Sequence, residues 1–120
     1  MKAASVALAI ILCASPVFAA EKFRPLSGAQ IFARLPGKEI TDNIHFADVF
    51  VPSGALMSYA MGRKMTGKWR VQQDLLCLER GKEPVSCYQI WMAGNKIEMR
   101  FKGNNLAFFE GVLQPPASRK

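Results

Sequence analysis

The chain has 120 residues with 16 lysines and arginines against nine acidic residues, which gives a net charge of +7 at pH 7. Half of the residues are hydrophobic, and the length allows one small domain with its own core rather than two. A positive charge of this size favours contact with anionic surfaces and argues against a function that depends on an acidic face.

Residues 1–20 have the pattern of a cleavable secretion signal, with Lys2 at the start, an apolar run at 7–12 and Val17-Phe18-Ala19 at the exit. The apolar run is too short to span a bilayer, so we expect a single domain over residues 21–120 with no transmembrane anchor after cleavage. Loss of Lys2 lowers the net charge from +7 to +6. The signal predicts a periplasmic or secreted protein.

Two other interpretations of this segment are a retained transmembrane helix and a lipid anchor at Cys13. The first fits less well because polar sequence follows the apolar run. The second fits less well because Leu12 stands where lipid-attachment signals have a small residue.

The mature chain begins with an extended lead-in at 21–26, followed by a predicted helix at 28–34. Ser27 and Gln30 match a capping box, in which the serine accepts a hydrogen bond from the helix start and the glutamine reaches back. Pro36-Gly37 ends the helix.

From Lys38 onward, short alternating runs separated by turn residues predict antiparallel strands. The expected strands are 38–42, 45–51, 55–61, 67–72, 75–80, 85–93, 96–102 and 108–113. We therefore predict a mainly β (α+β) fold, with a short N-terminal helix before an antiparallel meander of about six to eight strands. Because one face of the sheet is apolar, we expect a barrel or a half-barrel.

Predicted two-residue turns at Gln73-Asp74 and Gly94-Asn95 fix the register of two hairpins. Both registers separate an apolar face from a polar one. The predicted core face consists of Trp69, Val71, Leu76, Leu78, Tyr88, Ile90, Met92, Ile97, Met99 and Phe101.

Cys77 and Cys87 are the two cysteines of the mature chain. A third hairpin, with its loop around 80–84, places them directly opposite each other, within reach of a disulfide on the outer face. An oxidising compartment supports the bond, which we expect to stabilise the domain by about 2–3 kcal/mol. A redox pair fits less well because catalytic dithiols favour a two-residue spacing at a helix start.

The same registers gather cations and a tryptophan on the outer face of the sheet. The predicted contact surface consists of Arg70, Trp91, Arg100, Lys102 and Lys68, with Arg63 and Lys64 from a loop at 62–67. In an exported protein its partner is an anionic lipid, lipopolysaccharide or an acidic envelope component, and not nucleic acid. The alternative is that the cations only pack their stems over Trp91.

A second candidate function is a lipocalin-like carrier of a small apolar ligand. Its cavity would be lined by Trp69, Met57, Met61, Met92 and Met99. Gly67-Lys68-Trp69 resembles the Gly-x-Trp of lipocalin-type barrels, although it lies in mid-chain. The alternative is that these side chains fill an irregular core. A third candidate, a periplasmic lysozyme inhibitor, is disfavoured because lysozyme is itself basic.

Motifs of enzymes are missing from the sequence. It has no Gly-rich phosphate loop, no Gly-x-Ser-x-Gly and no His-Glu-x-x-His, and His45 is its one histidine. A triad of His45, Asp42 or Asp48 and a serine arises by chance in a chain of this length. We therefore expect a non-enzymatic protein with no catalytic residue, no metal site and no cofactor.

The patterns Gly67-Lys68-Trp69-Arg70-Val71, Leu76-Cys77-Leu78 and Cys87-Tyr88, together with the opening Leu26-Ser27-Gly28-Ala29, cover most of the mature chain. In these motifs the chain resembles a family of small secreted proteobacterial proteins of unknown function. The resemblance implies a periplasmic, mainly β domain with paired cysteines. It implies no established activity.

Overall fold

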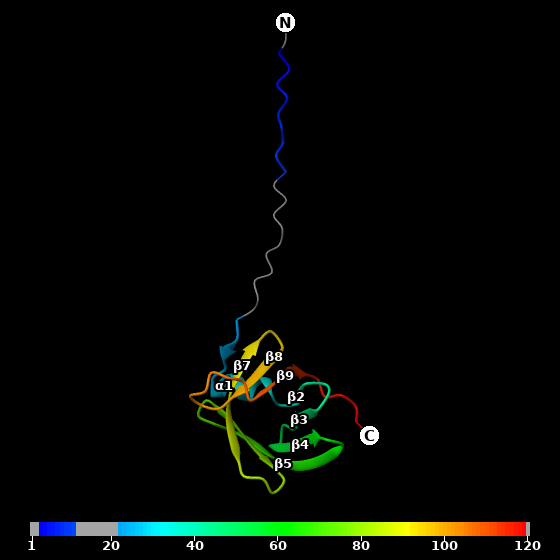
Figure 1. The fold of residues 1–120 in the computed structure, drawn as a ribbon, viewed down its shortest axis with the longest axis vertical. Coiled ribbons are helices and arrows are strands. Elements are labelled where there is room, and N and C mark those ends of the chain that lie inside the picture. The colour runs from blue at the N-terminus through cyan, green and yellow to red at the C-terminus, as the bar shows by residue number, and fades with distance from the viewer. Residues whose placement is uncertain (1–2, 12–21, 120) are drawn as a thin grey trace.

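The computed structural model of the chain describes residues 3–11 and 22–119 (Figure 1). Residues 3–11 contain neither helix nor strand, and no helix in the described ranges is long and apolar enough to cross a membrane. The predicted cleavage site at 17–19 and Cys13 lie outside the described residues.

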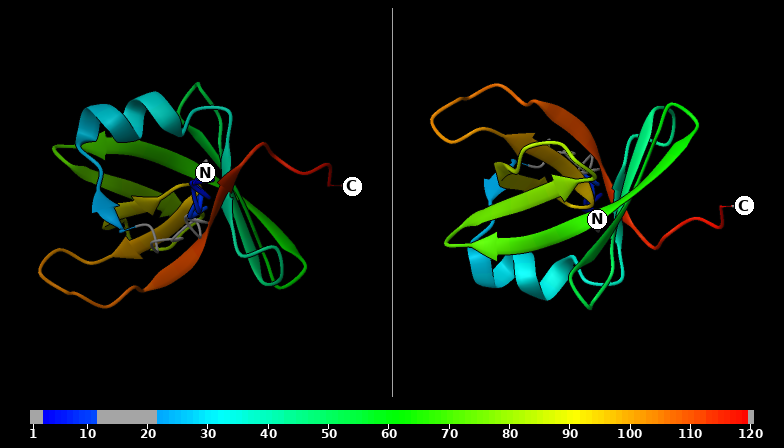
Figure 2. Two further views of the ribbon diagram at one scale, coloured as in Figure 1. Left: turned by 90° about the horizontal axis from the view of Figure 1, so that it is seen from above. Right: turned by 90° about the horizontal axis from the view of Figure 1, so that it is seen from below.

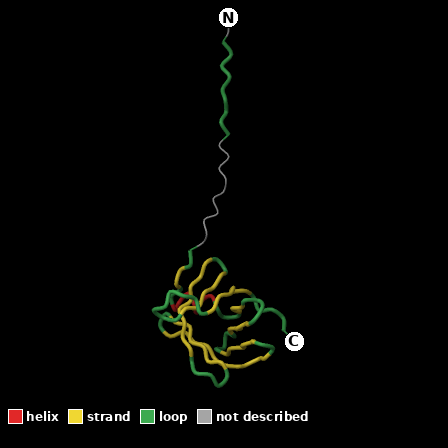
Figure 3. Tube along the Cα trace, viewed as in Figure 1, coloured by secondary structure: helices red, strands yellow, loops and turns green. Residues whose placement is uncertain are grey.

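From residue 22 to residue 119 the chain forms one short helix and nine strands (Figures 1 and 3). The elements are β1 (Arg24–Pro25), α1 (Gly28–Arg34), β2 (Glu39–Thr41), β3 (Phe46–Phe50), β4 (Ala55–Ala60), β5 (Arg63–Gln72), β6 (Leu75–Arg80), β7 (Ser86–Ala93), β8 (Lys96–Arg100) and β9 (Phe109–Gln114). The predicted fold class, a short helix before an antiparallel meander, is confirmed.

The sheet closes into a barrel of eight strands. Each strand from β2 to β8 pairs antiparallel with the next one in the chain, and β9 also pairs with β2. β1 stands outside this cycle and pairs with the second half of β7, whose first half pairs with β6. Of the two predicted forms, the structure has the barrel and not the half-barrel.

The two predicted turns and their registers are confirmed. Trp69 lies opposite Leu78, and Ile90 lies opposite Met99. These side chains point into the barrel and join a core that also contains Phe50 and Leu56. Phe101 does not belong to the buried set, because β8 ends at Arg100 and the phenyl ring is partly exposed.

One strand begins earlier than predicted. Met61-Gly62 forms a two-residue turn, so β5 pairs with β4 from Arg63 onward, where Arg63 lies opposite Ala60. The predicted loop at 62–67 is therefore wrong, and residues 63–66 are strand. Sequence reasoning missed this because the turn lacks the usual Asn-Gly or Asp-Gly pair.

The predicted disulfide is present. Cys77 of β6 and Cys87 of β7 are paired directly opposite each other and bonded to one another. The bond lies on the outer side of the sheet, although Cys77 itself is buried. It fastens β6 to β7 where only three residue pairs join the two strands.

Helix α1 covers one end of the barrel. Ser27 and Gln30 form the predicted capping box, and Ile31 with Leu35 enters the core. The N–H of Gly28 donates to Asp74 in the β5–β6 turn, and a Cβ at Gly28 would lie only 2.0 Å from the carbonyl oxygen of Gln73. Glycine is required there because the helix start touches the turn backbone.

The seam between β2 and β9 is held by the C-terminal tail. Glu39 of β2 is fully buried, and its Oε1 accepts hydrogen bonds from the N–H of Ala117 and from the side chain of Gln114. Its Oε2 lies 2.8 Å from Nη2 of Arg119. A buried carboxylate needs such partners, so the tail is part of the fold.

An ion pair lies inside the barrel, away from the helix. Asp48 of β3 is buried and accepts from Ser58 at 2.7 Å and from two guanidinium nitrogens of Arg80. Burial lowers the pKa of Arg80, but its hydrogen bond with Asp48, the charge of Asp48 and Tyr88 outweigh burial and raise the pKa above its ordinary value. The guanidinium of Arg80 therefore stays charged inside the barrel.

Candidate functional site

The two ends of the barrel are built from different loops. In an up-and-down barrel alternate connections lie at the same end. The connections 42–45, 61–62, 81–85 and 101–108 therefore share the end away from α1. In the right-hand view of Figure 2 the helix is at the bottom, while the 101–108 loop and the β4–β5 turn reach the top on either side. We call these four connections, with the adjoining Arg63 and Lys64, the rim.

The rim carries most of the exposed apolar side chains of the domain. Between Lys22 and Arg119 seven large apolar side chains are exposed, and Phe32 on α1 is the one that lies away from the rim. The six at the rim are Ile44, Met61, Val85, Phe101, Leu106 and Phe108. Because exposed apolar side chains gathered at one end of a domain are a common feature of interaction surfaces, the rim is a candidate contact surface.

The 101–108 loop is held by an aromatic cluster. Phe108 stacks on the buried Tyr88 with ring centroids 6.1 Å apart, and Phe101 lies 4.8 Å from Phe108. The side chain of Asn104 accepts a hydrogen bond from the N–H of Leu106. The side chain of Leu106 is 75% exposed at the tip of the loop. The loop therefore presents an apolar side chain from a fixed base.

Met61 is exposed in a strained position. It is 95% exposed and has a φ of 52°, and the following Gly62 also has a positive φ. Turns of this kind favour Asn or Gly at the first position, because other residues resist a positive φ. An apolar side chain at this position therefore costs stability, which makes Met61 a candidate contact residue.

The 42–45 loop is folded around Asp42. Its carboxylate accepts from the backbone N–H groups of Ile44, His45 and Phe46 and from the ring of His45. Burial raises the pKa of Asp42, but these hydrogen bonds outweigh burial and hold the pKa well below its ordinary value. The carboxylate thus fixes the loop that exposes Ile44.

Cations surround the apolar tips. Arg63 and Lys64 follow the β4–β5 turn, Lys82 lies in the 81–85 loop, and Lys102 lies in the 101–108 loop. The acidic groups of the rim are Glu83 and Asp42, and the second of these is engaged by its own loop. The rim therefore combines separated apolar tips with a positive charge.

The predicted basic face is divided by the structure. Arg100 stacks on Trp91, with Cζ 4.1 Å from the ring centroid, and is paired with Glu98 on the same strand. Arg70 and Lys68 are exposed on β5, opposite Cys77 and Glu79. Lys102, Arg63 and Lys64 belong to the rim instead. The packing of Arg100 over Trp91 matches the alternative that a cation covers the tryptophan.

The five side chains predicted to line an apolar cavity do not lie together. Trp69 and Met99 are buried in the core, and Met92 packs against its edge beside Arg34. Met57 lies on the outward side of β4, between Val49 and Thr66 in the ladder, and Met61 is in the exposed turn. The five side chains therefore do not line one cavity, because strand alternation sends Met57 outward.

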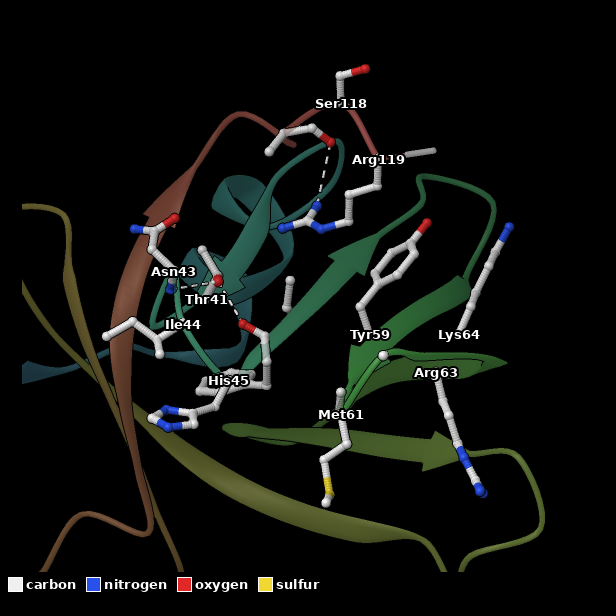
Figure 4. Close-up of a pocket in the computed structure, with 15 residues that line it drawn as sticks. Thr41, Asn43, Ile44, His45, Tyr59, Met61, Arg63, Lys64, Ser118 and Arg119 are labelled. Atoms are coloured by element: carbon white, nitrogen blue, oxygen red, sulfur yellow. Dashed lines mark hydrogen bonds between the residues drawn. The ribbon is translucent and has the colours of Figure 1, made fainter.

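A groove of about 800 Å³ lies on the outer wall beside the rim (Figure 4). Its floor is the row of paired residues Thr41, Ala47, Tyr59 and Lys64, which crosses β2 to β5. The C-terminal tail forms one wall, and the rim residues Ile44, His45, Met61 and Arg63 form the other. The small Ala47 leaves the hollow in the middle of the row.

Arg119 enters the groove from the tail. Its Cζ lies 4.9 Å from the ring centroid of Tyr59 (Figure 4). Its ion pair with Glu39 fixes the guanidinium. Sequence reasoning missed this groove because its tail wall lies beside β2 only when β9 closes the barrel. It missed the rim because the loops of the predicted meander were not compared end by end.

Within the described residues no group of three or more His, Cys, Asp or Glu side chains is arranged to hold a metal ion. Comparison of the chain with family models, curated proteins and solved structures gave no match in any of the three. The resemblance to a family of small secreted proteins therefore stays a prediction.

Proposed function

We propose that this protein is a non-enzymatic docking module of the cell envelope, and that its rim binds the surface of an anionic lipid membrane. The observation that carries the proposal is the gathering of six exposed apolar side chains in the loops of one barrel end. The predicted export would place this end beside the lipid surfaces of the envelope.

The chemistry of the rim suits a lipid interface. Apolar side chains such as Leu106 and Phe108 gain free energy when they leave water for the acyl boundary, and lysines beside them are attracted to anionic headgroups. Lys102 lies in the same loop as both of these side chains. Insertion and charge therefore act together.

A fluid surface fits the rim better than a protein partner does. The tips are carried by four separate loops around the barrel end, with cations between them. A protein partner would need a complementary pocket for each tip, whereas lipids rearrange around separated side chains. The basic composition favours the same partner.

The test is sedimentation with vesicles of phosphatidylcholine, alone or mixed with phosphatidylglycerol, at low and high salt. We expect binding to the anionic vesicles, weakened by salt because the lysines contribute through screened charges. Phe108→Ser should weaken binding about tenfold by removing one inserted ring. Phe32→Ser, which changes a ring on α1 that is 66% exposed against 56% for Phe108, is the matched control and should bind normally.

Two outcomes would overturn the proposal. One is that the protein stays in the supernatant with both kinds of vesicle. The other is that Phe32→Ser weakens binding as much as Phe108→Ser does, which would mean that the rim is not the contact surface.

A further inference from the structure

The groove beside the rim carries cations from two distant parts of the chain. Arg63 and Lys64 come from the start of β5, and Arg119 comes from the tail. Among the residues that the structure describes, no aspartate or glutamate lines the groove. Arg119 is held by Glu39 and by the ring of Tyr59, so its guanidinium is already positioned while Glu39 balances its charge. The unbalanced positive charge of the groove comes from Arg63 and Lys64.

Hydroxyl groups accompany these cations. Tyr59 and Ser118 line the groove with hydroxyl groups, and in Figure 4 Tyr59 lies between Arg119 and Lys64. The hydroxyl of Thr41 is buried and bonded to Phe46 and Asn43, so it serves the loop and not a ligand. Arginine and lysine bind phosphate through charge-assisted hydrogen bonds, while hydroxyl groups suit a polyol. The volume of about 800 Å³ holds more than a lone phosphate.

The groove also lies at a depth, relative to the rim, that suits contact with lipid headgroups. It shares Ile44 and Met61 with the rim, and these side chains are 82% and 95% exposed. If they enter the membrane surface, the cations just behind them stand at the level of the lipid headgroups.

We propose that this groove binds the phosphate-bearing headgroup of an anionic lipid, with the phosphate on Lys64 and Arg119 and a polyol on the hydroxyl groups. The inference rests on the proposed docking of the rim and adds selectivity to it. A surface that only senses charge would not distinguish phosphate from carboxylate, whereas a positioned set of donors would.

The experiment compares two kinds of anionic vesicle with matched surface charge. One contains phosphatidylglycerol, and the other contains cholesteryl hemisuccinate, whose charge is a carboxylate. We expect the wild-type protein to prefer the phosphate vesicles about tenfold. Lys64→Gln should remove this preference, while the matched Lys102→Gln should weaken binding to both vesicles about fivefold and leave their ratio unchanged.

A second measurement uses a free headgroup. In a titration of the protein with glycerol 1-phosphate without vesicles, the amide NMR signals of Thr41, Ala47 and Lys64 should shift, and Lys64→Gln should reduce these shifts. This arm separates a soluble phosphate ligand from the lipid source.

The two proposals fail in different ways. Equal binding to both vesicles by the wild-type protein, or a ratio unchanged by Lys64→Gln, would overturn the headgroup site while docking stands. Loss of all vesicle binding together with shifts by glycerol 1-phosphate would overturn docking and leave a site for a soluble phosphate compound.

Discussion

The two ends of this barrel differ in how they are covered. At one end α1 covers the core, Ile31 and Leu35 are fully buried, and the connecting turns carry polar residues such as Gln73 and Asn95. At the other end no helix in the described chain covers the opening, and the loops display Ile44, Met61, Leu106 and Phe108 instead.

The difference between the two ends suggests a division between residues that stabilise the fold and residues that we propose to bind a membrane. The capped end contributes buried area and a well-capped helix, which are features of folding. The rim keeps apolar side chains in water, where they contribute little to folding, and we propose that they serve as an interface. If this division is right, substitutions should change the free energy of unfolding and vesicle binding independently.

The largest expected effect is at the ion pair beneath the rim. Arg80→Met leaves Asp48 buried without its partner and should lower the free energy of unfolding by about 3–5 kcal/mol. Adding Asp48→Val removes the orphaned charge, so the double variant should recover much of the loss. Urea unfolding at neutral pH measures both, and a double variant no more stable than Arg80→Met would contradict the account.

The disulfide should come next. Replacing Cys77 and Cys87 together by serine should cost about 2–3 kcal/mol, because the bond closes a short loop in the unfolded chain. Since the bond joins β6 to β7 outside the rim, vesicle binding of the folded variant should not change. Thermal unfolding and sedimentation, each compared with oxidised wild-type protein, check the two statements, and reduced wild-type protein should unfold like the variant.

Asp42 offers a test that depends on pH. Asp42→Asn should lower stability by about 1–2 kcal/mol at pH 7, because the ionised carboxylate accepts several backbone hydrogen bonds. The pKa of Asp42 is lowered by folding, so its contribution is complete above the ordinary value of 3.8 and is lost as pH falls below it.

The difference between Asp42→Asn and the wild type should therefore shrink in acid, as measured by unfolding at pH 7 and at successively lower pH. Glu83→Gln removes an exposed carboxylate from another rim loop and serves as the control. A difference that stays constant across this range would contradict the role of Asp42.

The smallest expected effect on stability is at Met61, where stability and vesicle binding should change in opposite directions. Met61→Asn should raise the stability by about 0.5–1 kcal/mol, because asparagine accepts the positive φ of this turn. The same change removes an apolar tip, so vesicle binding should weaken. A variant that gains stability and keeps its full affinity would remove Met61 from the contact surface.

The sequence predicts the fold well where local rules act. The capping box at Ser27, the turn at Gly94-Asn95 and the opposition of Cys77 and Cys87 follow from spacing and turn chemistry. The turn at Met61-Gly62 broke those rules, so the start of β5 was placed too late. Closure between β2 and β9 leaves no local signal, and the groove depends on it.

The β2–β9 seam has a consequence for the order of assembly. Every other neighbouring pair of barrel strands is joined by a single hairpin, so those contacts form as soon as adjacent segments meet. The seam alone joins the first and last strands of the cylinder. Glu39 therefore has no ionic partner until the segment that contains Arg119 has folded against it. A polypeptide emerging from a membrane pore amino end first could therefore not complete its cylinder until nearly all of it had crossed.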